Sequence, residues 1–279
     1  MPAPERRVDV VIVNWNTAQK AVESANGYAT SQGVETRVTI VDNDSVESQA
    51  RILEAARADG IEVIEAGSNL GFGAAANLGV NRGEAEYVLI SNADVMPRPD
   101  TVAAMVNAAA VTRDVGLVGP VFGEGGDIYH DDLPSPFILL VRTFVGGYGR
   151  KAFDLPGPGR TAPVEQPSGA CFLMERATWQ AAGGFDDGYF LWYEDVDLAR
   201  RLHDDGHNSL IVGDARVNHV GGESFGKVSA RTQQSIRLDS LGRYLKLHHR
   251  FTHLLARPLL WLSGKLRGDG SHRPGQGAS

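Results

Sequence analysis

The sequence predicts an α/β protein with a mostly parallel sheet, helices on both faces of that sheet, and a helical C-terminal extension. Strand-like and helix-like segments alternate from residue 8 to about residue 120, with the spacing of βαβ units. The apolar run at residues 87–90 is typical of a strand that is buried on both faces, as in a parallel sheet. With 279 residues, 42% of them hydrophobic, the chain is long enough to bury such a core.

The composition argues against several classes of protein. A net charge of −7 disfavours nucleic acid as the main partner. The first apolar run, residues 8–13, is too short to span a bilayer, and we expect no secretory signal before it. Cys171 is the only cysteine, so we expect a small buried side chain, no intrachain disulfide and a cytoplasmic protein.

The predicted elements follow in order along the chain. Strands are expected at residues 8–13, 37–41, 61–64, 87–95, 115–120, 167–174 and 208–212. Helices are expected from residue 18 to about 29, at 47–58, after residue 71, and at 100–110, 175–182 and 194–205. The Gly- and Pro-rich region of about 123–167 is expected to be either a loop for the second substrate or a flexible linker.

Polar side chains stand where these strands end. Asp94 follows the central strand, Asp42 ends the second strand, and Asn14 and Asn16 follow the first. The carboxyl ends of parallel strands form the edge at which open α/β sheets bind ligands. Asp94 is therefore a candidate to hold a metal or a sugar hydroxyl, although it also suits a turn or a helix cap. The Asn14 and Asn16 side chains suit a base and its ribose.

A glycine-rich loop allows a second function. Gly71-x-Gly73-x-x-Ala76 matches a dinucleotide-binding fingerprint, with Asp94 about twenty residues later, and so allows an NAD-dependent oxidoreductase. Against this, the glycines follow the third strand rather than the first, and Asn69 adds a polar side chain that a pyrophosphate loop does not need. Close packing of a helix on a strand would also explain the glycines.

Acidic residues and a histidine complete the set of candidates. Glu194 and Asp195 occupy the first turn of a predicted helix, whose dipole keeps a carboxylate ionised for use as a general base. Acidic residues are also common at helix starts without any such role. His219 stands before two glycines and suits a metal ligand if it lies beside Asp94. His248, His249 and His253 are expected on the surface of a terminal helix.

Taken together, these motifs resemble the family 2 glycosyltransferases of the GT-A fold, and most closely their rhamnosyltransferase-like branch. The resemblance runs from about Val8 to Ser224. It rests on an ordered set of motifs: Val11-Ile12-Val13-Asn14-Trp15-Asn16, Val41-Asp42-Asn43-x-Ser45, Asn69-Leu70-Gly71-Phe72-Gly73-Ala74-Ala75-x-Asn77, Asn92-Ala93-Asp94-Val95, Gly169-Ala170-Cys171 and Tyr193-Glu194-Asp195-Val196-Asp197-Leu198.

The resemblance implies an inverting, metal-assisted transferase that uses a nucleotide-diphospho sugar, with rhamnose linked to dTDP or UDP as the leading candidate. The implied donor-binding residues are Asn14, Asn16, Asp42, Asn69, Gly71, Gly73, Asn77 and Asn92. Asp195 is implied as the catalytic base beside Glu194, and Gly169 and Trp192 as acceptor-binding residues. Asp94 and His219 are implied ligands of Mg²⁺ or Mn²⁺. Asn92 replaces the first acid of the family's Asp-x-Asp motif, so Asp94 supplies the carboxylate alone. A non-catalytic nucleotide-sugar binder is the remaining alternative.

We therefore expect a glycosyltransferase domain over residues 1–230, a basic amphipathic helical extension over 231–267 and a disordered tail over 268–279. The basic residues of the extension are Arg237, Arg243, Lys246, Arg250, Arg257, Lys265 and Arg267. With the apolar run at 251–262, this extension suits peripheral contact with the inner face of a membrane. Packing on the domain or in a homodimer is the alternative. The acceptor is expected to be a glycan, a lipid-linked saccharide or a small metabolite.

Overall fold

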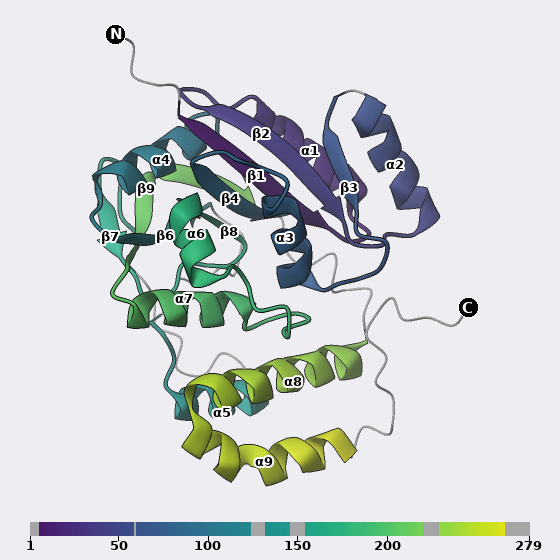
Figure 1. The fold of residues 1–279 in the computed structure, drawn as a ribbon, viewed down its shortest axis with the longest axis vertical. Coiled ribbons are helices and arrows are strands. Elements are labelled where there is room, and N and C mark those ends of the chain that lie inside the picture. Colours follow the sequence, from purple (N-terminus) through teal and green to yellow (C-terminus); the bar gives the residue numbers. More distant parts are fainter. Residues whose placement is uncertain (1–5, 59, 124–131, 146–153, 220–228, 266–279) are drawn as a thin grey trace.

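A computed structural model describes residues 6–58, 60–123, 132–145, 154–219 and 229–265, and it confirms the predicted α/β class (Figure 1). The strands are β1 (Arg7–Asn14), β2 (Glu35–Asp42), β3 (Glu62–Glu65), β4 (Tyr87–Asn92), β5 (Val95–Pro97), β6 (Val115–Phe122), β7 (Thr161–Pro163), β8 (Cys171–Glu175) and β9 (Asn208–His219). The helices are α1 (Ala18–Ala29), α2 (Glu47–Ala58), α3 (Phe72–Val80), α4 (Thr101–Val111), α5 (Pro136–Val145), α6 (Arg176–Ala182), α7 (Glu194–Asp204), α8 (Ala230–His248) and α9 (Arg250–Lys265).

The strands form one sheet in the order β3-β2-β1-β4-β8-β6-β9-β5, with β7 paired to β9. The pairs along β3-β2-β1-β4 are parallel, as is β6 with β9, whereas β8, β5 and β7 run antiparallel to their partners. The chain builds outward from β1 to β3 and then returns to β4 on the other side of β1. This reversal places a topological switch point at the carboxyl end of β1, where a crevice for a ligand is expected.

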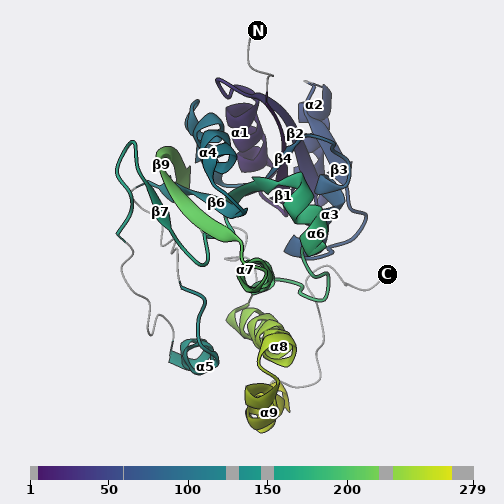
Figure 2. The same ribbon diagram turned by 60° about the vertical axis from the view of Figure 1, so that its left-hand side comes forward.

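Alternating side chains of β1 separate two apolar layers. Val8, Val10 and Ile12 face α1 and α4, while Val11 and Val13 face α3, α6 and α7. A helix layer therefore covers each face of the sheet, as Figures 1 and 2 show. Cys171 is fully buried in the first layer, as predicted, and lies 3.4 Å from the Tyr28 hydroxyl.

The structure differs from the sequence prediction at several strand boundaries and adds helix α5 and strand β7 within the region predicted as a loop or linker. The apolar run at 137–141 belongs to helix α5, which begins at Pro136, a residue suited to the first helical position. The strand predicted at 87–95 ends at Asn92, and residues 95–97 form a separate strand, β5, because they pair with β9. The last strand extends from Asn208 to His219, well beyond the predicted residue 212, because it pairs with three other strands.

Two helices follow the sheet domain. Ser229 caps α8 by accepting a hydrogen bond from the Thr232 backbone N–H, and His249 separates α8 from α9. Leu241, Tyr244 and Leu245 of α8 form a separate apolar cluster with Leu139 and Tyr189. Within the described ranges, every helix is too short or too polar to cross a membrane. The predicted tail at 268–279 lies outside the described residues, and the division into domains stays a prediction.

Candidate active site

The carboxyl ends of β1 and β2 form the first part of the site. Asn14 and Asp42 are register partners, and the Asn14 side-chain amide donates to Asp42 Oδ1 at 3.0 Å. The Ser45 hydroxyl donates to the same Asp42 oxygen at 2.6 Å and accepts from the Asn16 backbone N–H at 2.8 Å. Among the described residues, the hydrogen bonds of the Asp42 carboxylate all fall on Oδ1. Asp42 Oδ2 is therefore left for a ligand.

A buried asparagine holds the loop that follows β3. The Asn43 side-chain amide donates to Asn69 Oδ1 at 3.0 Å and to the Gly71 carbonyl at 3.1 Å, and Asn43 Oδ1 accepts from the Leu70 N–H at 2.8 Å. This loop therefore lies beside the β2 end. Sequence reasoning did not single out Asn43, although it stands between Asp42 and Ser45 in one of the quoted motifs.

The glycines of this loop permit close contact with the segment that precedes α7. Gly71 has a φ of +86°, and a Cβ on it would collide with the Phe190 carbonyl oxygen. A Cβ on Gly73 would lie 3.1 Å from Phe185 Cβ and 3.5 Å from Glu194 Cβ. The glycines therefore allow residues 185–194 to approach the start of α3.

Asn77 joins the same two segments. Its side-chain amide donates to the Phe185 carbonyl at 2.8 Å and to Asp187 at 2.7 Å, and its Oδ1 accepts from the Phe185 N–H at 3.0 Å. These contacts fix the loop before α7. A direct contact between Asn77 and a donor stays a prediction.

Asp94 and His219 come together through the pairing of β5 with β9. Val95 is the register partner of His219, and His219 Nε2 lies 3.2 Å from Asp94 Oδ1. Burial raises the pKa of Asp94, but the hydrogen bond from His219 and the charges of His219 and Lys20 outweigh burial and hold this pKa below its usual value. Asp94 is therefore ionised at neutral pH, as a ligand of a divalent cation must be.

Asp195 lies on the first turn of α7, directly above Gly169. A Cβ on Gly169 would lie 2.5 Å from Asp195 Oδ2, so this approach requires glycine. The Val196 backbone N–H donates to Asp195 Oδ1 at 2.9 Å, and the Gln166 amide lies 3.4 Å from Oδ2. The segment before β8 therefore fixes the position of the Asp195 carboxylate.

Burial raises the pKa of both Glu194 and Asp195, and the charge of Asp195 raises the pKa of Glu194 further. Hydrogen bonds to Asp195 from Val196, Gly169 and Gln166 oppose the rise, because they stabilise its ionised form. Glu194 Oε2 is buried with no hydrogen-bond partner among the described residues. The hydrogen bonds therefore favour the ionised form at Asp195 more than at Glu194, and a general base requires the ionised form.

The end of β4, close to Asp94 in the sequence, contacts the segment over which Asp195 lies. Asn92, two residues before Asp94, donates its backbone N–H to the Ala170 carbonyl at 2.8 Å. Ala170 follows Gly169, over which the Asp195 carboxylate lies. A continuous set of contacts therefore links the end of β4 to the start of α7.

The fit between Gly169 and Asp195 gives a prediction. Replacing Gly169 with alanine is expected to displace the Asp195 carboxylate by the width of a methyl group and to lower kcat roughly a hundredfold, with nucleotide affinity kept. Steady-state kinetics and calorimetric titration of the nucleotide check both parts. Gly157→Ala is the matched control, because a Cβ on Gly157 has no atom within 4 Å. Equal kcat in the two variants would contradict the role of Gly169.

Trp192 lies in the turn that leads to the start of α7. Trp192 and Tyr193 both adopt left-handed conformations, with φ of 63° and 71°, which are rare for bulky residues and typical of functional sites. The Arg237 guanidinium lies 4.7 Å from the centre of the Trp192 ring. The contact of Trp192 and Gly169 with an acceptor stays a prediction.

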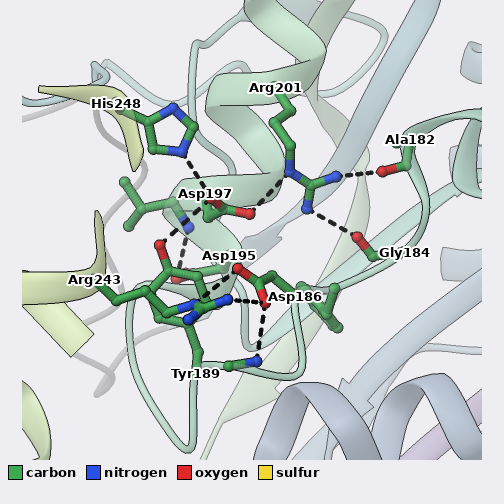
Figure 3. Close-up of polar contacts among 12 residues, drawn as sticks. Ala182, Gly184, Asp186, Tyr189, Asp195, Asp197, Arg201, Arg243 and His248 are labelled. Atoms are coloured by element: carbon green, nitrogen blue, oxygen red, sulfur yellow. Dashed lines mark hydrogen bonds and ion pairs between the residues drawn. The ribbon is translucent and has the colours of Figure 1, made fainter. Parts of the chain in front are cut away.

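Asp197 points away from this site into a second polar cluster, which sequence reasoning missed (Figure 3). It accepts from Arg201 Nε at 2.9 Å and lies 2.7 Å from His248 Nε2. Arg201 also donates to the Ala182 and Gly184 carbonyls. The predicted surface position of His248 is wrong, because α8 packs beside α7. His249 and His253 are half-buried.

Removing the Asp197 carboxylate is expected to destabilise the fold. Asp197→Ala leaves Arg201 and His248 partly buried without their anion, so we expect a loss of about 3–5 kcal/mol in the free energy of unfolding. Asp204→Ala breaks an exposed ion pair with Arg200 on the same helix and is expected to cost about 0–1 kcal/mol. Urea unfolding measures both. Similar losses in the two variants would contradict the role of this cluster.

The fold is that of the GT-A glycosyltransferases. A solved mannosyltransferase from Pyrobaculum calidifontis in complex with GDP-Man and Mn²⁺ superposes with a TM-score of 0.60, at 17% identity over 95% of this chain and 75% of that one. GalNAc-T7, solved with UDP, GalNAc and Mn²⁺, superposes with a TM-score of 0.65, at 17% identity over 96% of this chain and 53% of that one. At these identities the likeness concerns the fold.

The sequence pattern of glycosyl transferase family 2 matches residues 9–176, and the chain belongs to that family. One relative is an N-acetylglucosaminyl-diphospho-decaprenol L-rhamnosyltransferase of Mycobacterium tuberculosis. It is 29% identical over 244 residues, covering 78% of this chain and 73% of the relative. The family membership rejects the oxidoreductase alternative and confirms the predicted class of enzyme.

Proposed function

We propose that this glycosyltransferase moves a hexose, with rhamnose as the leading candidate, from a dTDP- or UDP-linked donor to an acceptor hydroxyl with inversion at the anomeric carbon. The observation that carries the proposal is the contact between the end of β4, two residues before Asp94, and the segment at Gly169 and Ala170, over which the Asp195 carboxylate lies. The rhamnosyl transfer named for the mycobacterial relative supports the choice of sugar.

The nucleotide is proposed to bind at the ends of β1 and β2. Asp42 Oδ2 suits a ring N–H of uracil or thymine, because Asn14 and Ser45 already hold Oδ1. A cavity of about 300 Å³ lies beside Asp42, between α2 and β3. The loop at Asn69 and Gly71, held by Asn43, would border the ribose and diphosphate.

Asp94 and His219 fit a divalent cation. An ionised carboxylate and an imidazole nitrogen 3.2 Å apart provide two suitable donor atoms, and the buried His219 Nδ1 has no partner among the described residues. Across those same residues, His, Cys, Asp and Glu side chains form no group of three that suits a metal. Bound Mg²⁺ or Mn²⁺ would offset the charge that develops on the diphosphate. The solved neighbours that contain Mn²⁺ support this choice of metals.

Asp195 is proposed as the general base. Its carboxylate accepts the proton of the acceptor hydroxyl while the hydroxyl oxygen attacks the anomeric carbon. The bond from that carbon to the diphosphate oxygen breaks in the same displacement, and the nucleotide diphosphate leaves from the opposite face. One displacement inverts the configuration, so no covalent intermediate on a carboxylate is required.

This role makes the activity depend on pH. Because burial raises the pKa of Asp195, kcat/KM is expected to fall with decreasing pH along an acid limb that lies above the ordinary aspartate value of 3.8. The Gln166 amide stabilises the ionised form, so Gln166→Leu should move this limb to higher pH by up to about one unit. Gln180→Leu, at an exposed glutamine of α6, is the control. A limb that stays in place or moves to lower pH would contradict the contact.

The donor can be identified before the acceptor is known. A screen of nucleotide sugars for slow hydrolysis, with and without Mn²⁺, is expected to select a dTDP- or UDP-linked hexose, with the highest rate for dTDP-rhamnose. Thermal shift with dTDP, UDP, GDP and NAD(H) supplies a readout that is independent of turnover. Selection of a GDP-linked sugar would overturn the proposed nucleotide, and hydrolysis of none would favour the non-catalytic binder.

A lipid-linked saccharide is the acceptor class that we favour. The name of the mycobacterial relative specifies an acceptor on a diphospho-decaprenol carrier. Trp192 lies at the entrance to α7 and would offer its ring to an acceptor sugar, since aromatic faces pack well on the apolar face of a pyranose. Glycans and small metabolites are the alternatives that an acceptor assay separates.

A further inference from the structure

We propose that the outer face of α9, consisting of Phe251, Leu254 and Leu255, docks the enzyme on the surface of an anionic lipid bilayer. These three side chains are 75%, 60% and 66% exposed. They are spaced as neighbours on one side of a helix, and the exposed Pro258 continues the same side. The opposite side of α9 packs on α8 through Ala256, which is 2% exposed.

The orientation of α9 is the reverse of that expected for a helix that only completes a core. A helix on a protein surface normally turns its apolar side inward and its polar side to water. Here the large apolar side chains of the first turns face outward, and Phe137 of α5, a helix that lies beside α8, is also exposed. An outward apolar face of this kind marks a contact with a partner or with lipid.

The charge of the extension favours lipid as that partner. Residues 229–265 contain seven Lys or Arg and one Asp, a net charge of +6, in a chain whose total is −7. Arg237 and Arg243 are engaged by Trp192 and Asp186, whereas Lys246 and Arg250 are exposed at the corner between α8 and α9. Cations beside an apolar helix face are typical of segments that lie on anionic membranes.

The same extension is joined to the catalytic end of the sheet. Ser240 Oγ donates to the Leu191 carbonyl at 2.7 Å, and Arg243 makes two hydrogen bonds to Asp186. Figure 2 shows α7, α8 and α9 stacked in that order away from the sheet. A bilayer against α9 therefore lies on the side of the molecule that carries the Trp192 turn. The proposal stands on this surface alone and does not depend on the identity of donor or acceptor.

Flotation of the full chain with lipid vesicles tests the proposal. Binding is expected to vesicles of phosphatidylglycerol and phosphatidylcholine, and to be much weaker with phosphatidylcholine alone. Phe251→Ser, Leu254→Ser and Leu255→Ser combined should lower the partition coefficient by at least roughly a hundredfold. Lys246→Gln and Arg250→Gln should each lower it roughly fivefold, and high salt should act in the same direction.

The controls are an exposed valine and an exposed arginine elsewhere. Val111→Ser, at a side chain that is 85% exposed on α4, and Arg113→Gln should leave binding unchanged. Donor hydrolysis in the absence of vesicles should be equal in all variants, which separates this proposal from the proposed function. Failure of the unmodified chain to float with anionic vesicles would overturn the proposal. So would a dimer, detected by light scattering, that the triple substitution dissociates, because a second copy would then cover the face.

Discussion

Asp195→Asn is expected to lower kcat by roughly 10²–10⁴-fold while the affinity for the nucleotide stays the same. Asparagine has the shape of aspartate, so it fits above Gly169 and keeps the contact with the Val196 N–H, but it cannot take up the proton of the acceptor hydroxyl. Turnover with donor and acceptor measures the first effect, and calorimetric titration with dTDP or UDP measures the second.

Asp205→Asn is the matched control for this substitution. Asp205 is exposed at the opposite end of the same helix, and its replacement should leave kcat unchanged. If Asp195→Asn retained turnover, the base would have to be another group, with Glu194 the nearest alternative. If it lost nucleotide affinity as well as turnover, Asp195 would serve in donor binding rather than in proton transfer.

Asp94→Asn is expected to lower kcat on the order of a thousandfold, because it removes the one carboxylate at the proposed cation site. The Mn²⁺-dependent part of nucleotide affinity should disappear with it, whereas the part measured in EDTA should remain. Titration of dTDP with and without Mn²⁺ separates the two parts.

Asp100→Asn is the matched control, because it also removes one negative charge, six residues after Asp94 in the sequence. Asp100 is exposed before α4, and its side chain makes no capping hydrogen bond. Its replacement should leave the Mn²⁺ dependence intact. An unchanged Mn²⁺ dependence in Asp94→Asn would place the metal on other ligands.

The strand ends were predictable from the sequence because each ends an apolar run with a polar residue. In a parallel sheet those ends share one edge, which brought Asn14 and Asp42 into register. The position of His219 could not be predicted in this way, because His219 lies beside Asp94 only through the antiparallel pairing of β5 with β9. The resemblance to family 2 glycosyltransferases, rather than any local pattern, supplied that pair.

The roles of the acidic residues on α7 were harder to separate. Asp195 and Asp197 are two residues apart, roughly 200° around a helix, so they point to different sides. Which one faces the site depends on the packing of α7 against Gly169 and α8, contacts that are remote in sequence. Nothing in the sequence around His248 indicates that its side chain contacts Asp197.

The C-terminal helices show the same limit. The apolar run at 251–262 indicated an amphipathic helix, but no pattern within it decides which side faces the domain. Packing of Ala256 on α8 sets the rotation of α9 and turns Phe251 and Leu255 outward. Exposure of this kind follows from tertiary contacts, which the sequence of the helix alone does not contain.

A crystal structure of the Asp195→Asn variant with Mn²⁺ and the selected donor tests the central claim most directly. We predict one metal bound to Asp94 and His219 and to the diphosphate, with the side chain at position 195 facing the anomeric carbon from the side opposite the leaving diphosphate. A metal held by other residues, or a sugar that lies away from position 195, would contradict a reaction in which Asp94 and Asp195 act on the same sugar.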